Sequence, residues 1–301
     1  MSIEQWNTEF GISGQLRFIE GVGGLPFVEI SNENATATVS VYAGQLLSYL
    51  PADEAADLFF LSEHAYYQPG KAIKGGAPVC WPWFGPDPEE HGRPAHGFVR
   101  NRQWNVISTA ASSAGETKLT LGLMDTDETR EIWPKSFELQ LEITVGASLT
   151  LELITRNRGD QAFTITQALH SYFKVGDISQ VQVLGLEGDS YLDKVNGGAE
   201  KKQSGAVTIA GEVDRIYTDV QLEQVINDGA LGRRIHIASS GSRTAVVWNP
   251  WSEICTNMAD LADDAYQQFI CVETANAAED VVEIQPGSEH RMLASYTVQR
   301  G

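Results

Sequence analysis

The sequence has 301 residues, of which 42% are hydrophobic and 20% charged, and its formal net charge is −19 at pH 7. This balance is typical of a soluble globular protein with a large core, and the acidity excludes nonspecific binding to nucleic acids or anionic membranes, because both need a basic face. The chain has no apolar run of about 18 residues and its first residues lack the regions of a signal peptide, so we expect a cytoplasmic protein.

The cysteine content argues against a covalent or metal framework. Cys80, Cys255 and Cys271 are an odd number at wide spacings, which fits neither paired disulfides nor a paired-thiolate zinc site. We expect three buried thiols.

Short runs of alternating apolar and polar residues follow one another along the chain, as in antiparallel strands with one buried face. Before residue 74 we expect strands at 16–19, 27–30, 36–42, 46–50 and 58–61. The next strands fall at 104–107, 118–124, 137–145, 149–155 and 162–173, and the polar loop 156–161 is predicted to close the last two into a hairpin. The remaining strands are expected at 181–184, 191–195, 207–209, 213–217, 233–238, 244–248, 269–273, 281–284 and 291–298.

Helical patterns are confined to two short stretches. Residues 125–131 read as an acidic turn or a single helical turn, and residues 260–269 as a short helix. Strands do not alternate with helices and no regular repeat occurs, which disfavours doubly wound and propeller folds. We therefore predict an all-β fold, a large antiparallel β-sandwich with few short helices, built as one domain over residues 1–301.

Residues 74–85, Lys-Gly-Gly-Ala-Pro-Val-Cys-Trp-Pro-Trp-Phe-Gly, form a segment that we call the aromatic wall; residues 94–100, Pro-Ala-His-Gly-Phe-Val-Arg, follow after a short acidic loop. Glycine and proline exclude a helix or a central strand here, and the aromatic content is too high for an ordinary linker. We expect a rigid wall that lines a binding site, the alternative being a surface loop capped by aromatics. Lys74 and Arg100 flank it, and in a chain with only 21 basic residues they are candidates to bind a phosphate group.

Three residues far apart in the sequence are candidates for acid–base chemistry. Glu273 ends a strand that is apolar on both faces, so burial should raise its pKa and make it a base near neutral pH. His170 lies on the small, polar face of the predicted 162–173 strand, and His96 lies in a turn constrained by proline and glycine. The structural alternatives are a buried glutamate paired with an arginine and histidines that serve packing alone.

Other chemistries have weaker support. The three candidates lie 74 and 103 positions apart, and neither His-x-His nor His-Glu-x-x-His occurs, so the spacing does not support a metal site. Gly-x-Ser-x-Gly and the nucleotide-binding glycine motifs are absent as well. We expect no metal and no cofactor.

Two tryptophans and one aspartate are further candidates for substrate binding. Trp81 and Trp248 have rings that can stack on the apolar face of a sugar, although each could equally belong to the core. Asp214 can accept hydrogen bonds from sugar hydroxyls, with an ion pair to Arg215 or a turn cap as the alternative.

Several separated motifs together resemble a known family. They are the aromatic wall with residues 94–100, Ala-Leu-His-Ser-Tyr-Phe at 168–173 with Val-Gly-Asp at 175–177, Val-Asp-Arg-Ile-Tyr at 213–217, Val-Trp-Asn-Pro-Trp at 247–251 and Cys-Val-Glu-Thr at 271–274. In this order they resemble the hexose-6-phosphate mutarotase branch of the aldose 1-epimerase family. One position departs from the pattern, because the family usually has arginine where this chain has Lys74.

The resemblance implies a galactose mutarotase-like β-sandwich and the interconversion of the α and β anomers of a hexose 6-phosphate, with glucose 6-phosphate as the first choice. In that mechanism Glu273 takes the proton of the C1 hydroxyl and His170 protonates the ring oxygen. His96 would hydrogen-bond the ring oxygen or an adjacent hydroxyl, while Lys74 and Arg100 would hold the phosphate.

Two other functions stay open from the sequence. A noncatalytic protein that binds or senses sugar phosphates would keep the aromatic and cationic residues without needing Glu273 and His170 together. A plain aldose 1-epimerase would act on unphosphorylated sugars. In each case the ligand is a small sugar, and the sequence indicates no nucleic acid, no membrane and no obligate protein partner.

Overall fold

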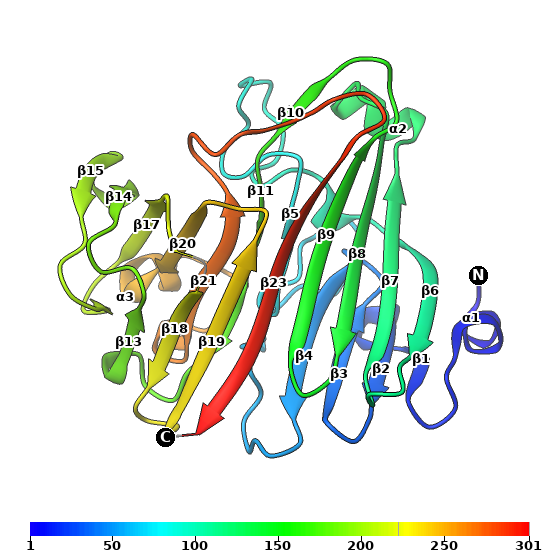
Figure 1. The fold of residues 1–301 in the computed structure, drawn as a ribbon, viewed down its shortest axis with the longest axis horizontal. Helices are drawn as coiled ribbons and strands as arrows, with labels where there is room; N and C mark the ends of the chain where they lie inside the picture. Colours follow the sequence, from blue (N-terminus) through cyan, green and yellow to red (C-terminus); the bar gives the residue numbers. More distant parts are fainter. Residues whose placement is uncertain (222, 301) are drawn as a thin grey trace.

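The computed structural model describes residues 1–221 and 223–300, and its largest element is a nine-stranded antiparallel sheet (Figure 1). Its strands are β6 (Asn105–Ala111), β7 (Thr117–Met124), β8 (Phe137–Val145), β9 (Leu149–Asn157), β13 (Val181–Leu184), β16 (Val207–Thr208), β18 (Glu223–Asp228), β19 (Arg233–Ser240) and β23 (Glu289–Arg300). They follow the order β16-β13-β18-β19-β23-β9-β8-β7-β6. In β8 buried and half-exposed residues alternate without a break, so one face of this sheet lies in the core.

Two further sheets form the second layer, which lies behind the nine-stranded sheet in Figure 1. The first is β1-β2-β3-β4, with β1 (Leu16–Glu20), β2 (Pro26–Ser31), β3 (Ala35–Ser40) and β4 (Gln45–Pro51). The second contains β5 (Val79–Cys80), β11 (Gln167–Leu169), β12 (Tyr172–Lys174), β14 (Ser190–Asp193), β15 (Ala199–Lys202), β17 (Val213–Thr218), β20 (Thr244–Asn249) and β21 (Phe269–Asn276). Its order is β15-β14-β17-β20-β21-β11-β5, and β12 also pairs with β21. A two-stranded sheet joins β10 (Phe163–Ile165) to β22 (Val282–Ile284).

The main core lies between the two layers. It contains Phe18 and Val28 from the four-stranded sheet, Val272 from the eight-stranded sheet, and Leu141 and Ile235 from the nine-stranded sheet, each at most 2% exposed. The predicted antiparallel β-sandwich is therefore confirmed. Each large sheet buries one face in this shared core. The opposite, outer face of the second layer is therefore available for a functional site.

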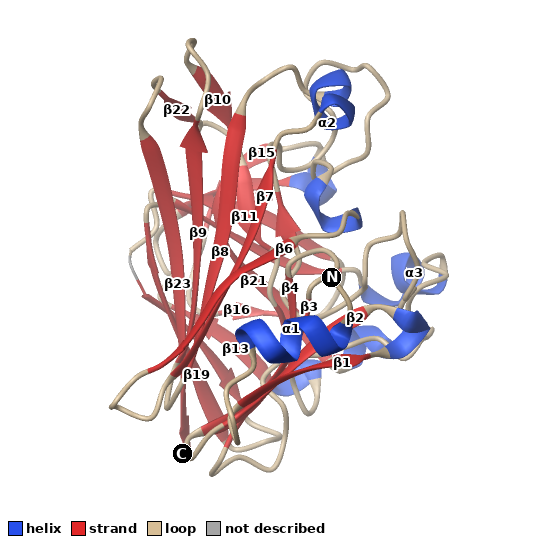
Figure 2. Cartoon of the chain, turned by 90° about the vertical axis from the view of Figure 1, so that its right-hand side faces the viewer, coloured by secondary structure: helices blue, strands red, loops and turns tan. Residues whose placement is uncertain are grey.

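The helices are short. They are α1 (Ile3–Phe10), α2 (Asp127–Ile132) and α3 (Trp251–Thr256), with single 3-10 turns at Val22–Gly24, Val99–Asn101, Ile178–Gln180, Lys194–Asn196 and Ala265–Gln267. In Figure 2, α3 lies on the side of the second layer that faces away from the nine-stranded sheet. In the part of the chain that the structure describes, no helix is long and apolar enough to cross a membrane.

Four predicted elements are wrong in detail. Residues 58–61 form only isolated bridges, because Phe59 pairs with Phe173 while Leu61 pairs with Gly75 in a different segment. The predicted 162–173 strand is split into β10, β11 and β12, which pair with different neighbours. Loop 156–161 closes no hairpin, since β9 pairs with β8 and β23 and β10 with β22. The expected helix at 260–269 is only the turn Ala265–Gln267.

Candidate active site

The aromatic wall is held at the edge of the eight-stranded sheet. Its only strand residues are the two of β5, which pair with Ala168 and Leu169 of β11. Gly76 has φ +64°, and a Cβ there would lie 2.2 Å from the carbonyl oxygen of Leu46, so only glycine lets the wall pack this closely on β4. The glycine pair that follows Lys74 thus fixes the wall against the second layer.

Glu273 lies in β21, which has neighbouring strands on both sides and is buried along its whole length. Phe269 and Cys271 pack on the outer face of the sheet with Tyr172, whereas Val272 faces the main core. The alternation along β21 therefore places Glu273 on the outer face together with Phe269 and Cys271. The residue is only 2% exposed, and its Oε2 has no hydrogen-bond partner among the described residues.

His170 lies at the break between β11 and β12. The amide of Ser171 donates to the carbonyl oxygen of Leu169 (2.9 Å), which closes a three-residue turn around His170. The amide of His170 itself donates to the carbonyl oxygen of Pro78 in the wall (2.9 Å). Its ring stacks on that of Tyr172, with centroids 4.8 Å apart and planes 8° apart. The broken strand thus aims the imidazole out of the sheet and fixes its plane.

The structure brings His170 and Glu273 together. Nδ1 of His170 lies 3.4 Å from Oε1 of Glu273, and the side chains are 10% and 1% exposed. Burial raises the pKa of Glu273 well above its ordinary value, and the nearby Asp214 raises it further, while Arg100 lowers it. Burial also lowers the pKa of His170 far below its ordinary value. Both groups are therefore held toward their neutral forms, one able to give a proton and the other to take it.

His96 lies beside this pair, with ring centroids 5.7 Å apart from His170. Its backbone is left-handed (φ +64°), and its amide donates to the carbonyl oxygen of Gly85 (2.7 Å). The amide of Gly85 donates in turn to Nδ1 of His96 (3.3 Å). Burial, aided by Arg100 and Lys74, lowers the pKa of His96 to about 3. The neutral ring therefore carries its proton on Nε2, which can donate a hydrogen bond to a ligand.

The two cations predicted to bind phosphate have different environments. Nζ of Lys74 lies 3.4 Å from Oδ2 of Asp260. Burial lowers the pKa of Lys74, Asp260 opposes this effect, and Arg100 adds to it. Arg100 donates to the carbonyl oxygen of Ala95 (3.1 Å), and no carboxylate among the described residues lies within ion-pair distance of it. Arg100 is thus a cation available to an anionic ligand.

The two neighbouring arginines are engaged elsewhere. Arg93 binds Asp87 (2.5 Å) and lies over the ring of Trp83, 4.3 Å from its centroid. Arg102 binds Glu128 (2.9 Å). Both guanidinium groups thus already have a carboxylate partner, unlike that of Arg100.

Trp248 and Asp214 lie in one cross-strand row of the eight-stranded sheet. Asp214 on β17 pairs with Trp248 on β20, which pairs with Cys271 on β21. The Trp248 ring stands edge-on to the ring of His170, with centroids 5.9 Å apart. Asp214 makes no ion pair with Arg215, whose guanidinium instead donates to Gln203 and lies over Tyr191. Trp248 and Asp214 therefore lie on the face that carries the pair.

Trp81 does not line the site, and the prediction that it contacts the sugar is wrong. The residue is 0% exposed, its Nε1 donates to Oγ1 of Thr155 (3.0 Å), and its ring packs on Phe137 (4.5 Å between centroids). Cys80, one residue earlier, faces the site side of the sheet. Because neighbouring residues of an extended segment point to opposite faces, Trp81 enters the main core.

Sequence reasoning missed two residues of the site. Tyr172 follows His170 by two positions and so lies on the same predicted face of the 162–173 strand. The alternation of that strand could therefore have identified it as a neighbour of His170. Asp260 had none, because it lies in an irregular stretch after α3 and reaches Lys74 only through the fold. In the described ranges, no three His, Cys, Asp or Glu side chains are grouped to hold a metal ion.

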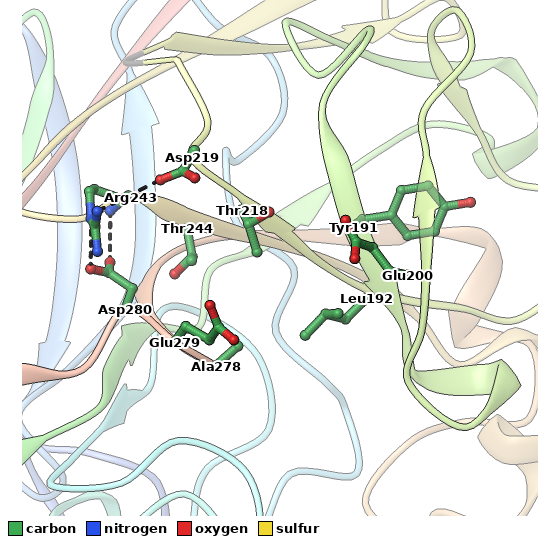
Figure 3. Close-up of a pocket in the computed structure, with 10 residues that line it drawn as sticks. All are labelled: Tyr191, Leu192, Glu200, Thr218, Asp219, Arg243, Thr244, Ala278, Glu279 and Asp280. Atoms are coloured by element: carbon green, nitrogen blue, oxygen red, sulfur yellow. Dashed lines mark hydrogen bonds and ion pairs between the residues drawn. The ribbon is translucent and has the colours of Figure 1, made fainter.

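A separate cavity of about 280 Å³ lies further along the same sheet (Figure 3). Its lining includes Thr218 and Thr244. Each lies two positions along its strand from Ile216 or Val246, the residues in cross-strand register with Glu273. Arg243, the cation of this lining, is bound by Asp280 (3.2 Å). Its other charged residues are Glu200, Asp219 and Glu279. An anionic sugar would be repelled here, so this cavity is not the predicted phosphate site.

Comparisons with known proteins give one consistent result. The family model described as aldose 1-epimerase matches residues 26–297. Over 256 residues the chain is 40% identical to an Escherichia coli K12 protein named "Putative glucose-6-phosphate 1-epimerase", covering 85% of this chain and 84% of that protein. A Cenchrus ciliaris protein of the same name is 36% identical, with 86% and 80% covered. The crystal structure of a "putative mutarotase" from Salmonella typhimurium superposes with a TM-score of 0.90 at 32% identity, over 97% and 96% of the two chains.

Proposed function

Because this chain belongs to the aldose 1-epimerase family, we propose that it interconverts the α and β anomers of a hexose 6-phosphate, with glucose 6-phosphate as the preferred substrate. The observation that carries the proposal is the buried contact between His170 and Glu273, at 3.4 Å, and Lys74 and Arg100 lie near enough for their charges to act on His170. The names of the similar proteins from Escherichia coli and Cenchrus ciliaris support the phosphorylated substrate.

Anomer exchange needs one group that takes a proton and one that gives a proton. In the proposed mechanism Glu273 removes the proton of the C1 hydroxyl while His170 protonates the ring oxygen, so the C1–O5 bond breaks and the free aldehyde forms. Rotation about C1–C2 presents the other face of the carbonyl. Ring closure with the two roles reversed gives the other anomer and restores both groups, so no net redox change occurs.

The pair needs a single proton for this cycle. Protonated Glu273 with neutral His170 has the same number of protons as the reactive form, a carboxylate beside an imidazolium. Burial favours the neutral arrangement in the free protein, and the charges of Arg100 and Lys74 disfavour the imidazolium further. A bound phosphate would neutralise these cations and so favour a proton on His170 when substrate is present.

The remaining residues have supporting roles in the proposal. His96 offers its Nε2 proton to the ring oxygen or an adjacent hydroxyl, and Asp214 accepts hydrogen bonds from sugar hydroxyls. Trp248 provides an apolar surface beside His170. Lys74 and Arg100 hold the phosphate, with lysine acting as a point charge where the family usually has arginine.

We also propose that the reaction takes place in the cytoplasm. Cys80, Cys255 and Cys271 are buried free thiols, and this state suits a reducing compartment.

A second candidate function is the epimerisation of unphosphorylated aldoses. The observation that favours it is the contact of Lys74 with Asp260, because a lysine that already has a carboxylate partner attracts a phosphate less strongly. In that case glucose or galactose would react at least as well as the 6-phosphate.

The test is an anomer-exchange measurement by NMR or polarimetry, starting from one pure anomer. Glu273→Gln and His170→Asn should each lower the enzymatic rate by about 10²- to 10⁴-fold. An enzymatic rate that both substitutions leave unchanged would refute this mechanism, and a wild-type rate equal to the spontaneous one would leave only a binding protein.

The substrate is decided by a parallel comparison of glucose 6-phosphate with glucose. Lys74→Ala and Arg100→Ala should raise the KM for the phosphate ester without raising the KM for glucose. Arg102→Ala is the matched control, because it removes a nearby arginine that is bound to Glu128. If all three variants behave alike, the phosphate is bound elsewhere.

A further inference from the structure

The contact between Lys74 and Asp260 is a fixed feature of the site. Their side chains are 15% and 22% exposed. Ser62 ties the two segments together, since its amide donates to the carbonyl oxygen of Lys74 (3.1 Å) and its hydroxyl donates to the carbonyl oxygen of Asp260 (2.7 Å). Asp260 is therefore held next to Lys74 by the backbone on both sides and does not depend on a mobile surface ion pair.

The placement of this carboxylate is specific within its segment. Asp263 and Asp264, three and four positions later, are exposed and make no ion pair among the described residues. Asp260 alone of the three reaches a cation, and that cation is one of the two proposed for phosphate. The other, Arg100, has no carboxylate partner among the described residues. An anion that enters this site meets one unpaired cation and one cation that already has a negative partner.

We propose that Asp260 is a specificity-determining residue that limits the preference of the site for a phosphate over a hydroxyl group at C6 of the sugar. The inference rests on the proposed function. A carboxylate beside Lys74 repels a dianionic phosphate and offsets part of the attraction of the lysine. It has no such effect on a neutral hydroxymethyl group, from which it can accept a hydrogen bond. Asp260 therefore lowers the affinity for sugar phosphates and inorganic phosphate and leaves that for free sugars intact.

The test compares Asp260→Asn with wild type in two measurements. One is the ratio of kcat/KM for glucose 6-phosphate to kcat/KM for glucose, and the other is the inhibition constant of inorganic phosphate. Removing one partly screened charge next to the phosphate should raise the ratio and lower the inhibition constant by about tenfold each. Asp263→Asn is the matched control, because it changes the net charge equally in the same segment without touching Lys74, and it should change both by less than about twofold.

Two further measurements keep the outcomes distinct. Asp260→Glu restores the charge and should return both values to those of wild type, and calorimetric titration with inorganic phosphate measures the affinity without activity. A wild type that ignores glucose 6-phosphate would refute the proposed function. If the wild type uses glucose 6-phosphate, two results would refute only the role of Asp260. One is an Asp260→Asn variant that binds inorganic phosphate no more tightly than the wild type, and the other is an Asp263→Asn variant with an equal effect.

Discussion

Replacing Glu273 with glutamine is expected to stabilise the protein at alkaline pH while it removes the activity. The carboxyl group is 2% exposed, and its Oε2 has no partner among the described residues. Its other oxygen lies 3.4 Å from Nδ1 of His170, which is longer than an ordinary charge-assisted hydrogen bond. The fold therefore holds this carboxyl group for a purpose other than stability.

The direction of the pH effect follows from the pKa of Glu273, which burial raises well above the ordinary value of 4.5. The raised pKa contributes stability that is fully present below the ordinary value and is lost as the pH rises through the raised one. A buried polar group without a partner costs about 1–3 kcal/mol, and a charged one costs more, so the ionised carboxylate costs at least about 2 kcal/mol above that pH. A glutamine of the same shape is never ionised and can donate from its amide to His170, so it avoids most of this cost.

The assay is thermal and urea unfolding of wild type and Glu273→Gln between pH 5 and pH 9. A difference of about 2 kcal/mol at the alkaline end corresponds to a Tm increase of about 4 °C. Glu283→Gln, at an exposed position of β22, is the control for the loss of one charge. Parallel stability curves for wild type and Glu273→Gln, or a less stable glutamine variant at pH 8, would refute the reasoning.

Three other substitutions test the wall and the charges around the site. Thr155→Val removes the acceptor of the buried Trp81 indole and should cost about 1–3 kcal/mol in urea unfolding with kcat unchanged; a drop in kcat at full stability would contradict this. Gly97→Ala places a Cβ 1.7 Å from the carbonyl oxygen of Trp81 at φ +73°, so kcat/KM and Tm should both fall, and an unaffected Tm would show that the turn is not rigid. Arg100→Gln removes a charge that lowers the pKa of both members of the acid–base pair, so both limbs of the pH profile of kcat/KM should move to higher pH; unmoved limbs would exclude this coupling.

The layers of the fold were predictable, whereas the pairing of the strands was not. When one face of a sheet lies in the core, apolar and polar residues alternate along its strands. The strands at 137–145 and 181–184 accordingly have the predicted bounds. The break at His170 has no such signal, because no glycine or proline marks it. It arises from contacts with Pro78 and Gly76, about 90 positions earlier, which local pattern cannot reveal.

The same distinction applies to the site. Alternation along residues 269–273 correctly groups Glu273 with Phe269 and Cys271 on one face of β21, but only the structure shows that this face is the outer one. The aromatic wall offers no period, so its composition could not tell that Trp81 faces the core while Cys80 faces the site. The contact of Asp260 with Lys74 could not be predicted, because Asp260 lies in an irregular segment without a periodic pattern.

The position of the pair on the outer face of the second layer explains how a buried carboxyl group is kept without weakening the core. The main core uses Val272 and the opposite face of the eight-stranded sheet, so changes at Glu273 leave its packing intact. The cover that desolvates the outer face comes from the segment that follows β20, because Cys255 and Leu261 pack there on Cys271. Asp260 lies in that segment as well. This segment, α3 with the irregular stretch after it, thus supplies both apolar cover on the outer face and the charge beside Lys74, so we expect the partly exposed change Asp260→Asn to alter substrate preference without altering the fold.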